Sequence, residues 1–294
     1  MGLTNNQRLL IEAISKNDLA AAKTRAIACL AEDTTAKNRL WVDRYKNILQ
    51  NAPKQLEELP TNLKGILLME DVSENFREDR YYLTEREAET AKRIIHMNEV
   101  GEKLAAMGIT YLNATLLYGE SGTGKTLFGR YIAYRMQLPF CYVNFSHLID
   151  SLMGKTSKNL NLLFRFASQS PCVLLLDELD CIGTRRGNAG TSGAEAEAAR
   201  ITITLIQELN SLPNNVILLG ATNRLELIDE AIRRRFRLHE VKPFSFDEKF
   251  ALLKKYNNTT GCAFSDKNLD EMAAMKENQS YLIQEFIEKL ADRL

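Results

Sequence analysis

The stretch best suited to bind phosphate is GESGTGKT, Gly119 to Thr126. It follows the apolar run ATLLY and precedes a segment with helical periodicity, which is the order strand, loop, helix of a phosphate-binding loop. Glycines let the backbone wrap so that its N–H groups and the amino end of the next helix point at the phosphates. We expect Lys125 to reach the β and γ phosphates of a nucleotide and Thr126 to hold Mg²⁺.

Two adjacent acids follow a later apolar run. In CVLLLDELD, Asp177 and Glu178 directly follow the apolar residues. A carboxylate at the carboxyl end of a parallel strand lies beside the phosphate crevice, so we expect Asp177 to orient magnesium-bound water. Glu178 is placed to take a proton from the water that attacks the γ phosphate. The alternative is that the acids only favour a helix amino terminus through its dipole.

A neutral amide follows the next predicted strand, ILLGATN. Asn223 lies where it could hold the attacking water and contact the γ phosphate. Asparagine also stabilises turns for purely local reasons. Its position after the acid pair favours the catalytic interpretation.

A cluster of cations lies in IDEAIRRRFRLHE, residues 228–240, where Arg233, Arg234, Arg235 and Arg237 are close together. The whole chain has 38 basic and 38 acidic residues, so its net charge is zero. Such a cluster could mark a nucleic-acid patch, a solvated helix end or an anion site.

The elements that must position these residues alternate along the chain. The predicted strands are ATLLYG, FCYVNF, CVLLLD, NVILLG and, more weakly, LHEVKP, and the helices between them begin near Lys125, Ser157, Ala194 and Ile228. Apolar strands separated by helices predict an α/β fold with a five-stranded parallel sheet covered on both faces. Ahead of the first strand, TERE at residues 84–87 matches a capping box that opens a long helix towards Met107.

The two ends of the chain differ from this pattern. Residues 3–50 read as three short amphipathic helices, and NAPKQLEELP, residues 51–60, predicts a linker. After residue 245 the strands stop and three helices follow. We therefore predict an N-terminal helical domain over 1–55, an αβα domain over 56–244 and a C-terminal helical lid over 245–294.

Composition narrows the classes of protein that remain. Of the 294 residues, 45% are hydrophobic and 26% charged, and the pI near 6.9 indicates no global attraction to nucleic acid or anionic lipid. The five cysteines are scattered, which favours reduced thiols in the cytoplasm. No apolar run approaches the length of a membrane span, so we expect no membrane contact. The chain has no HExxH pattern, which excludes a metalloprotease of that class.

Together these motifs resemble the AAA+ ATPases, within them the AAA subfamily of spastin, katanin, fidgetin and the ATPase modules of membrane-bound bacterial proteases. The resemblance runs from about Asp71 to the C-terminus. GESGTGKT resembles the Walker A motif, LLLDELD Walker B and GATN sensor 1, while IDEAIRRRF resembles the segment that ends in paired arginine fingers. It implies a P-loop αβα core with a helical lid, hydrolysis of ATP with Mg²⁺, and assembly into hexameric rings.

The resemblance also implies roles for single residues. Arg234 and Arg235 would be the fingers that complete a neighbour's site, and Asp71 with Val72 would begin the adenine-contacting segment. The implied nucleotide contacts in the loop are Gly119, Glu120, Ser121, Gly122, Thr123, Gly124, Lys125, Thr126 and Leu127. Glu120 and Ser121 replace the prolines common in this loop, and no arginine near Ser280 matches sensor 2.

SLMGKTSKNLNLLFRFA, residues 151–167, resembles the family's pore loop, in which an aromatic-hydrophobic-glycine triplet grips peptide. The triplet here is Leu152, Met153 and Gly154, without the usual aromatic residue. Methionine adapts to varied side chains. The alternative is that Leu152 and Met153 pack beneath the loop.

These features lead to three hypotheses of function. The first is an ATP-driven ring that remodels, unfolds or disassembles protein clients, recruited partly through the N-terminal helices or an adaptor, and that feeds a separate protease. The second is an AAA+ switch or loader that acts on nucleic acid. Lys155 and Lys158 favour this hypothesis, and the neutral charge balance argues against it. The third is a scaffold that uses ATP only to assemble.

Overall fold

The structure is a computed structural model. It describes residues 3–15, 19–33, 35, 38–39, 42–43, 45–46, 49, 63, 65–150, 156–169, 171–182, 192–213, 216–261 and 264–293. The chain divides into two compact units, Met1–Thr61 and Asn62–Leu294.

The first unit contains two helices that pack against each other, α1 (Asn5–Ser15) and α2 (Leu19–Glu32). The carboxylate of Glu32, at the end of α2, accepts hydrogen bonds from Thr4 Oγ1 at 3.0 Å and from Asn6 Nδ2 at 2.6 Å. These helices confirm the first two of the three predicted at this end of the chain. The third, over residues 36–50, and the linker lie mostly outside the described residues.

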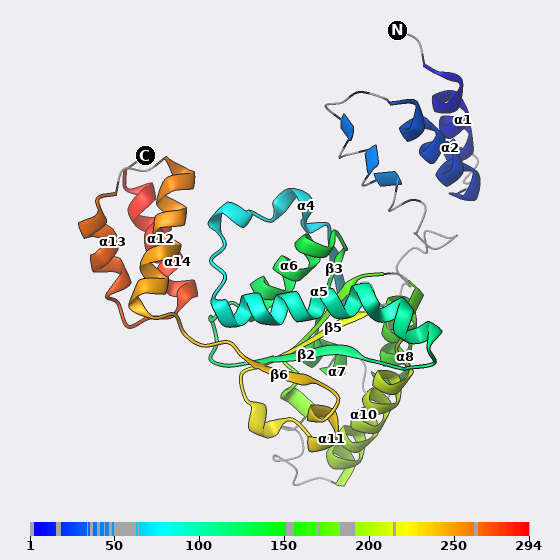
Figure 1. The fold of residues 1–294 in the computed structure, drawn as a ribbon. Coiled ribbons are helices and arrows are strands. Elements are labelled where there is room, and N and C mark those ends of the chain that lie inside the picture. The colour runs from blue at the N-terminus through cyan, green and yellow to red at the C-terminus, as the bar shows by residue number, and fades with distance from the viewer. Residues whose placement is uncertain are drawn as a thin grey trace. The chain divides into compact units, whose positions relative to one another are not determined.

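The second unit is built on a six-stranded sheet with the order β1-β3-β4-β5-β2-β6 (Figure 1). Its strands are β1 (Leu67–Glu70), β2 (Asn113–Tyr118), β3 (Phe140–Asn144), β4 (Val173–Asp177), β5 (Ile217–Thr222) and β6 (Arg237–Glu240). The last five are parallel and are the five strands predicted from the sequence.

The edge strand β1 was not predicted. It pairs antiparallel with β3, with Leu67 opposite Val143 and Glu70 opposite Phe140. An antiparallel edge strand needs no crossover helix between itself and its neighbour. The alternation of strands and helices along the sequence therefore gives no signal for it.

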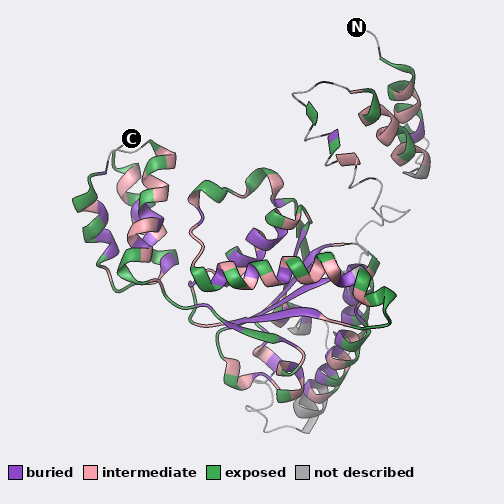
Figure 2. Ribbon diagram, in the orientation of Figure 1, coloured by how far each residue is buried: buried purple, intermediate pink, exposed green. Residues whose placement is uncertain are grey.

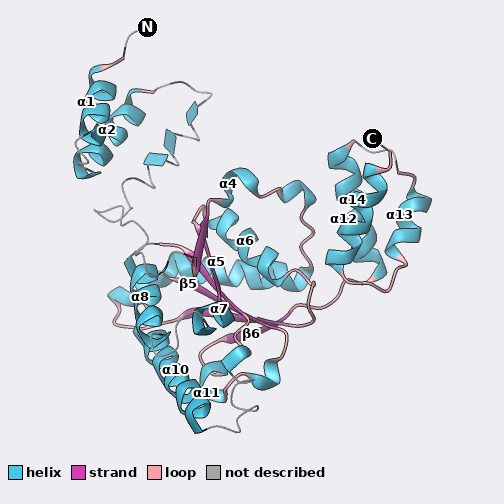
Figure 3. Ribbon diagram, turned by 180° about the vertical axis from the view of Figure 1, so that it is seen from behind, coloured by secondary structure: helices cyan, strands magenta, loops and turns pink. Residues whose placement is uncertain are grey.

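Helices cover both faces of the sheet. One layer contains α4 (Val72–Asn75), the 22-residue α5 (Glu85–Ala106) and α6 (Lys125–Met136), as Figure 1 shows. The other contains α7 (Phe145–Asp150), α8 (Thr156–Gln169) and α10 (Ser192–Ser211), seen from behind in Figure 3. The predicted αβα arrangement is thus confirmed.

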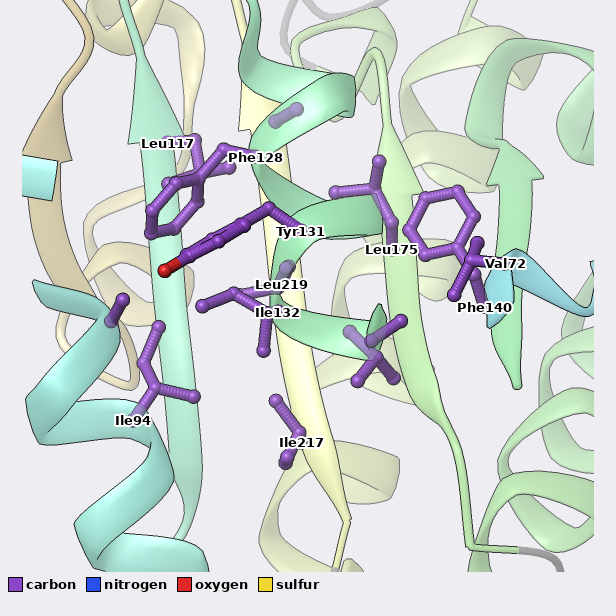
Figure 4. Close-up of a cluster of buried hydrophobic side chains, with 14 of the residues drawn as sticks. Val72, Ile94, Leu117, Phe128, Tyr131, Ile132, Phe140, Leu175, Ile217 and Leu219 are labelled. Atoms are coloured by element: carbon purple, nitrogen blue, oxygen red, sulfur yellow. The ribbon is translucent and has the colours of Figure 1, made fainter. Parts of the chain in front are cut away.

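The core follows the alternation of side chains along each strand. Leu175 of β4 and Leu219 of β5 pack with Phe128 and Ile132 of α6 and with Ile94 of α5 (Figure 4). The sheet between the helical layers is mostly buried, as Figure 2 shows. Burying a phenylalanine or leucine side chain of this kind contributes about 1.5–3 kcal/mol, so this layer holds α6 and the loop before it against the sheet.

The capping box predicted at TERE is present at the start of α5. Thr84 Oγ1 accepts a hydrogen bond from the Glu87 N–H at 3.2 Å, and the Glu87 carboxylate accepts one from the Thr84 N–H at 2.9 Å. Burial raises the pKa of Glu87, although the bonds from Thr84 act in the opposite direction. The box fixes where α5 begins.

Three helices end the chain: α12 (Phe246–Thr260), α13 (Asp266–Ala273) and α14 (Gln279–Ala291). They confirm the three helices predicted after residue 245, and they share a core of their own that includes Leu253, Leu269, Leu282 and Phe286. We call α12, α13 and α14 the lid.

Candidate functional site

The predicted site residues follow the carboxyl ends of three neighbouring strands. Tyr118, which precedes the glycine-rich loop, pairs with Thr222 of β5, and Leu176 of β4 pairs with Gly220. The segments that begin at Gly119, Asp177 and Asn223 therefore leave the sheet at one edge. Ligands of parallel sheets bind at this edge.

The loop from Gly119 to Gly124 depends on glycines at particular positions. Gly119 has φ of +148°, and a Cβ there would lie 2.2 Å from the carbonyl oxygen of Val241. Gly124 has φ of +96° and is the N-cap of α6. Residues with a side chain rarely adopt such backbone angles, so the glycines shape a loop that leads directly into a helix amino terminus.

Lys125, on the first turn of α6, folds back over the loop. Its Nζ donates to the carbonyl oxygens of Gly119 at 2.9 Å and Glu120 at 2.7 Å. Burial lowers the pKa of the Lys125 ammonium, while the carboxylates of Asp177 and Asp180 act in the opposite direction. The side chain is thus held over the loop, where it can bind phosphate oxygens.

Thr126 and Asp177 lie together although they are 51 residues apart in the sequence. Thr126 Oγ1 donates to Asp177 Oδ2 at 3.2 Å. A hydroxyl and a carboxylate beside a phosphate loop are the hard oxygen ligands that Mg²⁺ uses together with water and substrate phosphates. This donor pair fits the magnesium expected from the sequence, and among the described residues no group of three or more His, Cys, Asp or Glu side chains forms another metal site.

Glu178 has an unusual backbone conformation for a residue with a side chain. Its φ is +59°, a left-handed conformation that costs roughly 1–3 kcal/mol in a residue other than glycine. Two bonds hold this turn: the Glu178 N–H donates to Asp177 Oδ1 at 2.9 Å, and the Leu179 N–H donates to the Ala221 carbonyl oxygen at 3.1 Å. The Glu178 side chain is exposed at the carboxyl edge of the sheet, as a general base would require.

Asn223 directly follows β5 and is exposed. The residue before it, Thr222, donates from Oγ1 to Asp180 Oδ1 at 2.7 Å and accepts from the Arg224 N–H at 2.9 Å. Asp180 therefore joins the turn after β4 to the turn after β5, and so fixes Asn223 relative to Glu178. Asp180 was not predicted from the sequence, because its role depends on a contact between two segments that are distant in the sequence.

Arg234 and Arg235 lie away from this edge of the sheet. They follow α11 (Glu230–Arg233) and precede β6, whose first residue Arg237 pairs with Thr115, while Glu240 pairs with Tyr118. The length of β6, about 10 Å, thus separates the arginines from the edge that carries the loop. Within the chain, Arg234 pairs with Glu230.

Arg235 forms hydrogen bonds within its own chain. Its Nε donates to Asn210 Oδ1 at 2.9 Å, and its Nη1 donates to the Ala231 carbonyl oxygen. No described contact brings Arg234 or Arg235 to Lys125, Asp177 or Glu178. The arginines therefore lie on a different part of the domain from Lys125, Asp177 and Glu178 of their own chain.

Leu127, the residue after the loop's threonine, lines a cavity of about 250 Å³. Aromatic and cationic side chains surround it. Its lining residues are Glu70, Asn75, Phe76, Arg77, Arg80, Tyr81, Leu127, Arg130 and Tyr256. A cavity of this kind beside a phosphate loop offers apolar surface for a base.

The two residues expected to contact adenine, Asp71 and Val72, are close in sequence to residues that line this cavity, but they do not line it themselves. Asp71 is exposed and caps α4 by accepting from the Ser73 N–H at 3.0 Å, and Val72 is buried in the core. Asn75 and Phe76, which line the cavity, were missed because an amide and an aromatic ring at the end of a short helix carry no distinct motif.

The proposed pore triplet Leu152, Met153 and Gly154 lies outside the described residues. The helix that follows, α8, is described from Thr156, and its buried residues include Leu160, Leu163 and Phe164. None of the described helices is long and apolar enough to cross a membrane.

The chain is similar to several known proteins. Residues 115–244 match the family model described as "ATPase family associated with various cellular activities (AAA)". The chain is 34% identical over 140 residues to the 26S proteasome regulatory subunit 8 of Dictyostelium discoideum. This alignment covers 47% of this chain and 35% of that protein. It is 36% identical over 165 residues to the peroxisomal ATPase PEX6 of the same organism, covering 52% and 14%.

A third relative is the proteasome-activating nucleotidase of Archaeoglobus fulgidus, 33% identical over 185 residues, which cover 61% of this chain and 46% of that protein. The matched region thus spans less than half the length of each of these three relatives. Among solved structures, the AAA domain of FIGL-1 in complex with ADP has a TM-score of 0.56 and 22% identity over 76% of this chain and 75% of that one. That likeness shows the fold.

Proposed function

We propose that this chain, which carries an ATPase domain of the AAA family, hydrolyses ATP with Mg²⁺ in order to remodel protein clients. The observation that carries the proposal is the contact between Thr126 Oγ1 and Asp177 Oδ2 beside the glycine-rich loop. It brings the two expected magnesium ligands together at the edge of the sheet where Lys125 and Glu178 also lie. The similar proteins named above include a proteasome regulatory subunit and a proteasome-activating nucleotidase.

Each residue has a role in the proposed reaction. Lys125 and the loop N–H groups bind the phosphates, and Thr126 with Asp177 holds Mg²⁺, which neutralises charge on the phosphate oxygens. Glu178 accepts a proton from the attacking water, and Asn223 orients that water. The cavity beside Leu127 receives the base.

We propose that the arginines act between subunits. Arg234 and Arg235 lie at the amino end of β6, whereas the loop lies at the carboxyl ends of the strands. A guanidinium from a neighbouring copy could reach the γ phosphate. This requires that the subunits assemble so that the arginine finger of one subunit lies at the nucleotide site of the next. A closed ring, as a hexamer, satisfies every site in this way.

The client and the compartment are also part of the proposal. The neutral charge balance of the chain favours a protein client over nucleic acid, with Leu152, Met153 and Gly154 as the client-gripping triplet. The first compact unit, residues 1–61, is the proposed site for an adaptor, a client or a separate protease. Scattered cysteines favour the cytoplasm.

The proposal is tested with Glu178→Gln, which keeps the size of the side chain and removes the base. We expect this variant to bind ATP as tightly as the wild type, to hydrolyse it at least about 100-fold more slowly, and to retain its client in a pull-down with ATP. Addition of an unfolded polypeptide should stimulate the wild type, and single-stranded DNA should not. Unchanged turnover in Glu178→Gln would show that the base is wrongly assigned, and stimulation by DNA alone would contradict the protein client.

A further inference from the structure

The amino end of α14 contacts the glycine-rich loop directly. Asn278 Nδ2 donates to the Ser121 carbonyl oxygen at 3.1 Å, and the Ser280 N–H donates to the Gly122 carbonyl oxygen at 3.2 Å. Gln279 Nε2 lies 3.4 Å from the Thr123 carbonyl oxygen. Three successive residues of the lid thus bind three successive carbonyl groups of the loop.

These carbonyl groups belong to the peptides that shape the phosphate site. In a phosphate-binding loop the N–H groups point towards the anion, so the carbonyl groups remain for contacts on the outer side. A hydrogen bond accepted by a peptide carbonyl polarises that peptide and strengthens the bond donated by its N–H. Lid contact on one side of the loop and phosphate binding on the other therefore favour the same loop conformation.

Gln279 is the most constrained of the three lid residues. Only 5% of it is exposed, and its Nε2 also donates to the Lys242 carbonyl oxygen at 3.1 Å. Because both neighbours are carbonyl oxygens, the amide nitrogen faces them. The other amide atom, Oε1, is buried and has no hydrogen-bond partner within the part of the chain that the structure describes.

The unpartnered oxygen affects how firmly the lid is held. Burying an amide oxygen without a donor disfavours the arrangement that buries it. The docked lid is consequently less stable than its contacts alone suggest. An additional ligand that stabilises the loop can therefore shift the equilibrium between docked and undocked lid.

Asn278 links the loop to the helix itself. Its Oδ1 accepts from the Tyr281 N–H at 3.0 Å and so caps α14, while its Nδ2 reaches the loop. A Cβ on Gly122 would lie only 2.6 Å from Asn278 Nδ2. The loop and the helix cap are thus fitted closely to each other.

We propose that Asn278 and Gln279 are positioning residues that couple the lid to the loop, so that a nucleotide bound in the loop stabilises the docked lid through carbonyl contacts. The uncharged amides do this at the start of α14, where no arginine is available to contact phosphate. The inference rests on the proposed function in that it takes the loop to bind a nucleotide.

Two variants remove the contacts while preserving packing. Gln279→Met keeps an unbranched side chain of similar length but removes both donated bonds together with the unpartnered oxygen. Asn278→Ser keeps an oxygen that can cap α14 but is too short to reach Ser121. The control is Ser265→Ala, which removes the cap of α13, where Ser265 Oγ accepts from the Asn268 N–H at 3.3 Å.

The experiment measures amide hydrogen exchange in residues 279–291 of the full chain, with and without ADP and Mg²⁺. We expect ADP to protect α14 in the wild type and in Ser265→Ala. In Gln279→Met the protection should be lost, and a fluorescent ADP analogue should bind about tenfold more weakly, because two hydrogen bonds are removed. Asn278→Ser should weaken binding about threefold. The thermal midpoint of Gln279→Met without ADP should lie within a few degrees of the wild type, because removal of the unpartnered oxygen offsets part of the loss of the two hydrogen bonds.

The outcomes separate this inference from the proposed function. Equal ADP-induced protection in both variants and in the control would overturn the coupling. Wild-type protein that hydrolyses ATP, but whose α14 is not protected by ADP, would also overturn it and leave the proposed function intact. Protection of α14 in a wild type that does not hydrolyse ATP would support the coupling and contradict the proposed function.

Discussion

Replacing Arg235 by alanine tests whether one subunit completes the site of another. In the structure, Arg235 contacts Asn210 and Ala231 of its own chain. At about 0.5–1.5 kcal/mol for each hydrogen bond, their loss should lower the free energy of unfolding by about 1–3 kcal/mol. The loss of a catalytic guanidinium is larger, since arginine fingers are worth about 10³–10⁵ in kcat, or about 4–7 kcal/mol.

The assay is steady-state phosphate release by Arg235→Ala at saturating ATP, with circular dichroism to verify that the variant is folded. We expect ATP to bind with nearly unchanged affinity while kcat falls by about 10³ or more. Asn210→Ala is the matched control, because it removes the partner of Arg235 Nε and leaves the guanidinium in place. Its kcat should remain within about threefold of the wild type.

Mixing two inactive variants then tests action between subunits. Glu178→Gln chains lack the base but carry the arginine, and Arg235→Ala chains carry the base but lack the arginine. In an equal mixture about a quarter of the interfaces combine an intact base with an intact arginine, so activity should return to a comparable fraction of the wild type. If Arg235→Ala hydrolyses ATP at the wild-type rate, or if mixed assemblies recover no activity, the reasoning from the position of β6 is wrong.

Three further predictions concern the glycine-rich loop, Lys125 at the start of α6, and Glu87 at the start of α5. Gly119→Ala should lower the free energy of unfolding by about 1–3 kcal/mol and abolish ATP binding, because a Cβ would lie 2.2 Å from the Val241 carbonyl oxygen; a normal thermal melt with normal binding would contradict this. Burial lowers the pKa of Lys125 below its ordinary value of 10.5, so the ammonium loses its charge as pH rises through that lowered value. The affinity for MgATP should therefore start to fall before pH 10.5, which titrations at increasing pH would measure. Burial raises the pKa of Glu87 above 4.5. Between pH 4.5 and the raised pKa, the folded protein therefore binds more protons than the unfolded chain. The free energy of unfolding should fall as pH rises through this window. Glu87→Gln should reduce that slope in urea titrations, and an equal slope would show that Glu87 is not its source.

The parts of the fold that follow from short-range patterns were predictable. Thr84 and Glu87 form the predicted capping box, and the five parallel strands alternate with helices as their apolar runs indicated. Spacing also sufficed to relate Thr126 to Asp177, because a strand's carboxyl end and a phosphate loop share one edge of a parallel sheet.

Features that depend on pairing between distant segments were not predictable. β1 is only four residues long and depends on β3 for its hydrogen bonds. Asp180 gains its importance from Thr222, and Gln279 gains its importance from the loop and Lys242. Nothing in the local sequence of these residues distinguishes them from ordinary polar positions.

The division of the chain into Met1–Thr61 and Asn62–Leu294 has an evolutionary consequence. All the residues assigned to nucleotide chemistry belong to the second unit, so substitutions in α1 and α2 replace none of them. Selection for nucleotide chemistry therefore acts directly on the second unit, and the sequence of the first unit can diverge without changing an assigned residue.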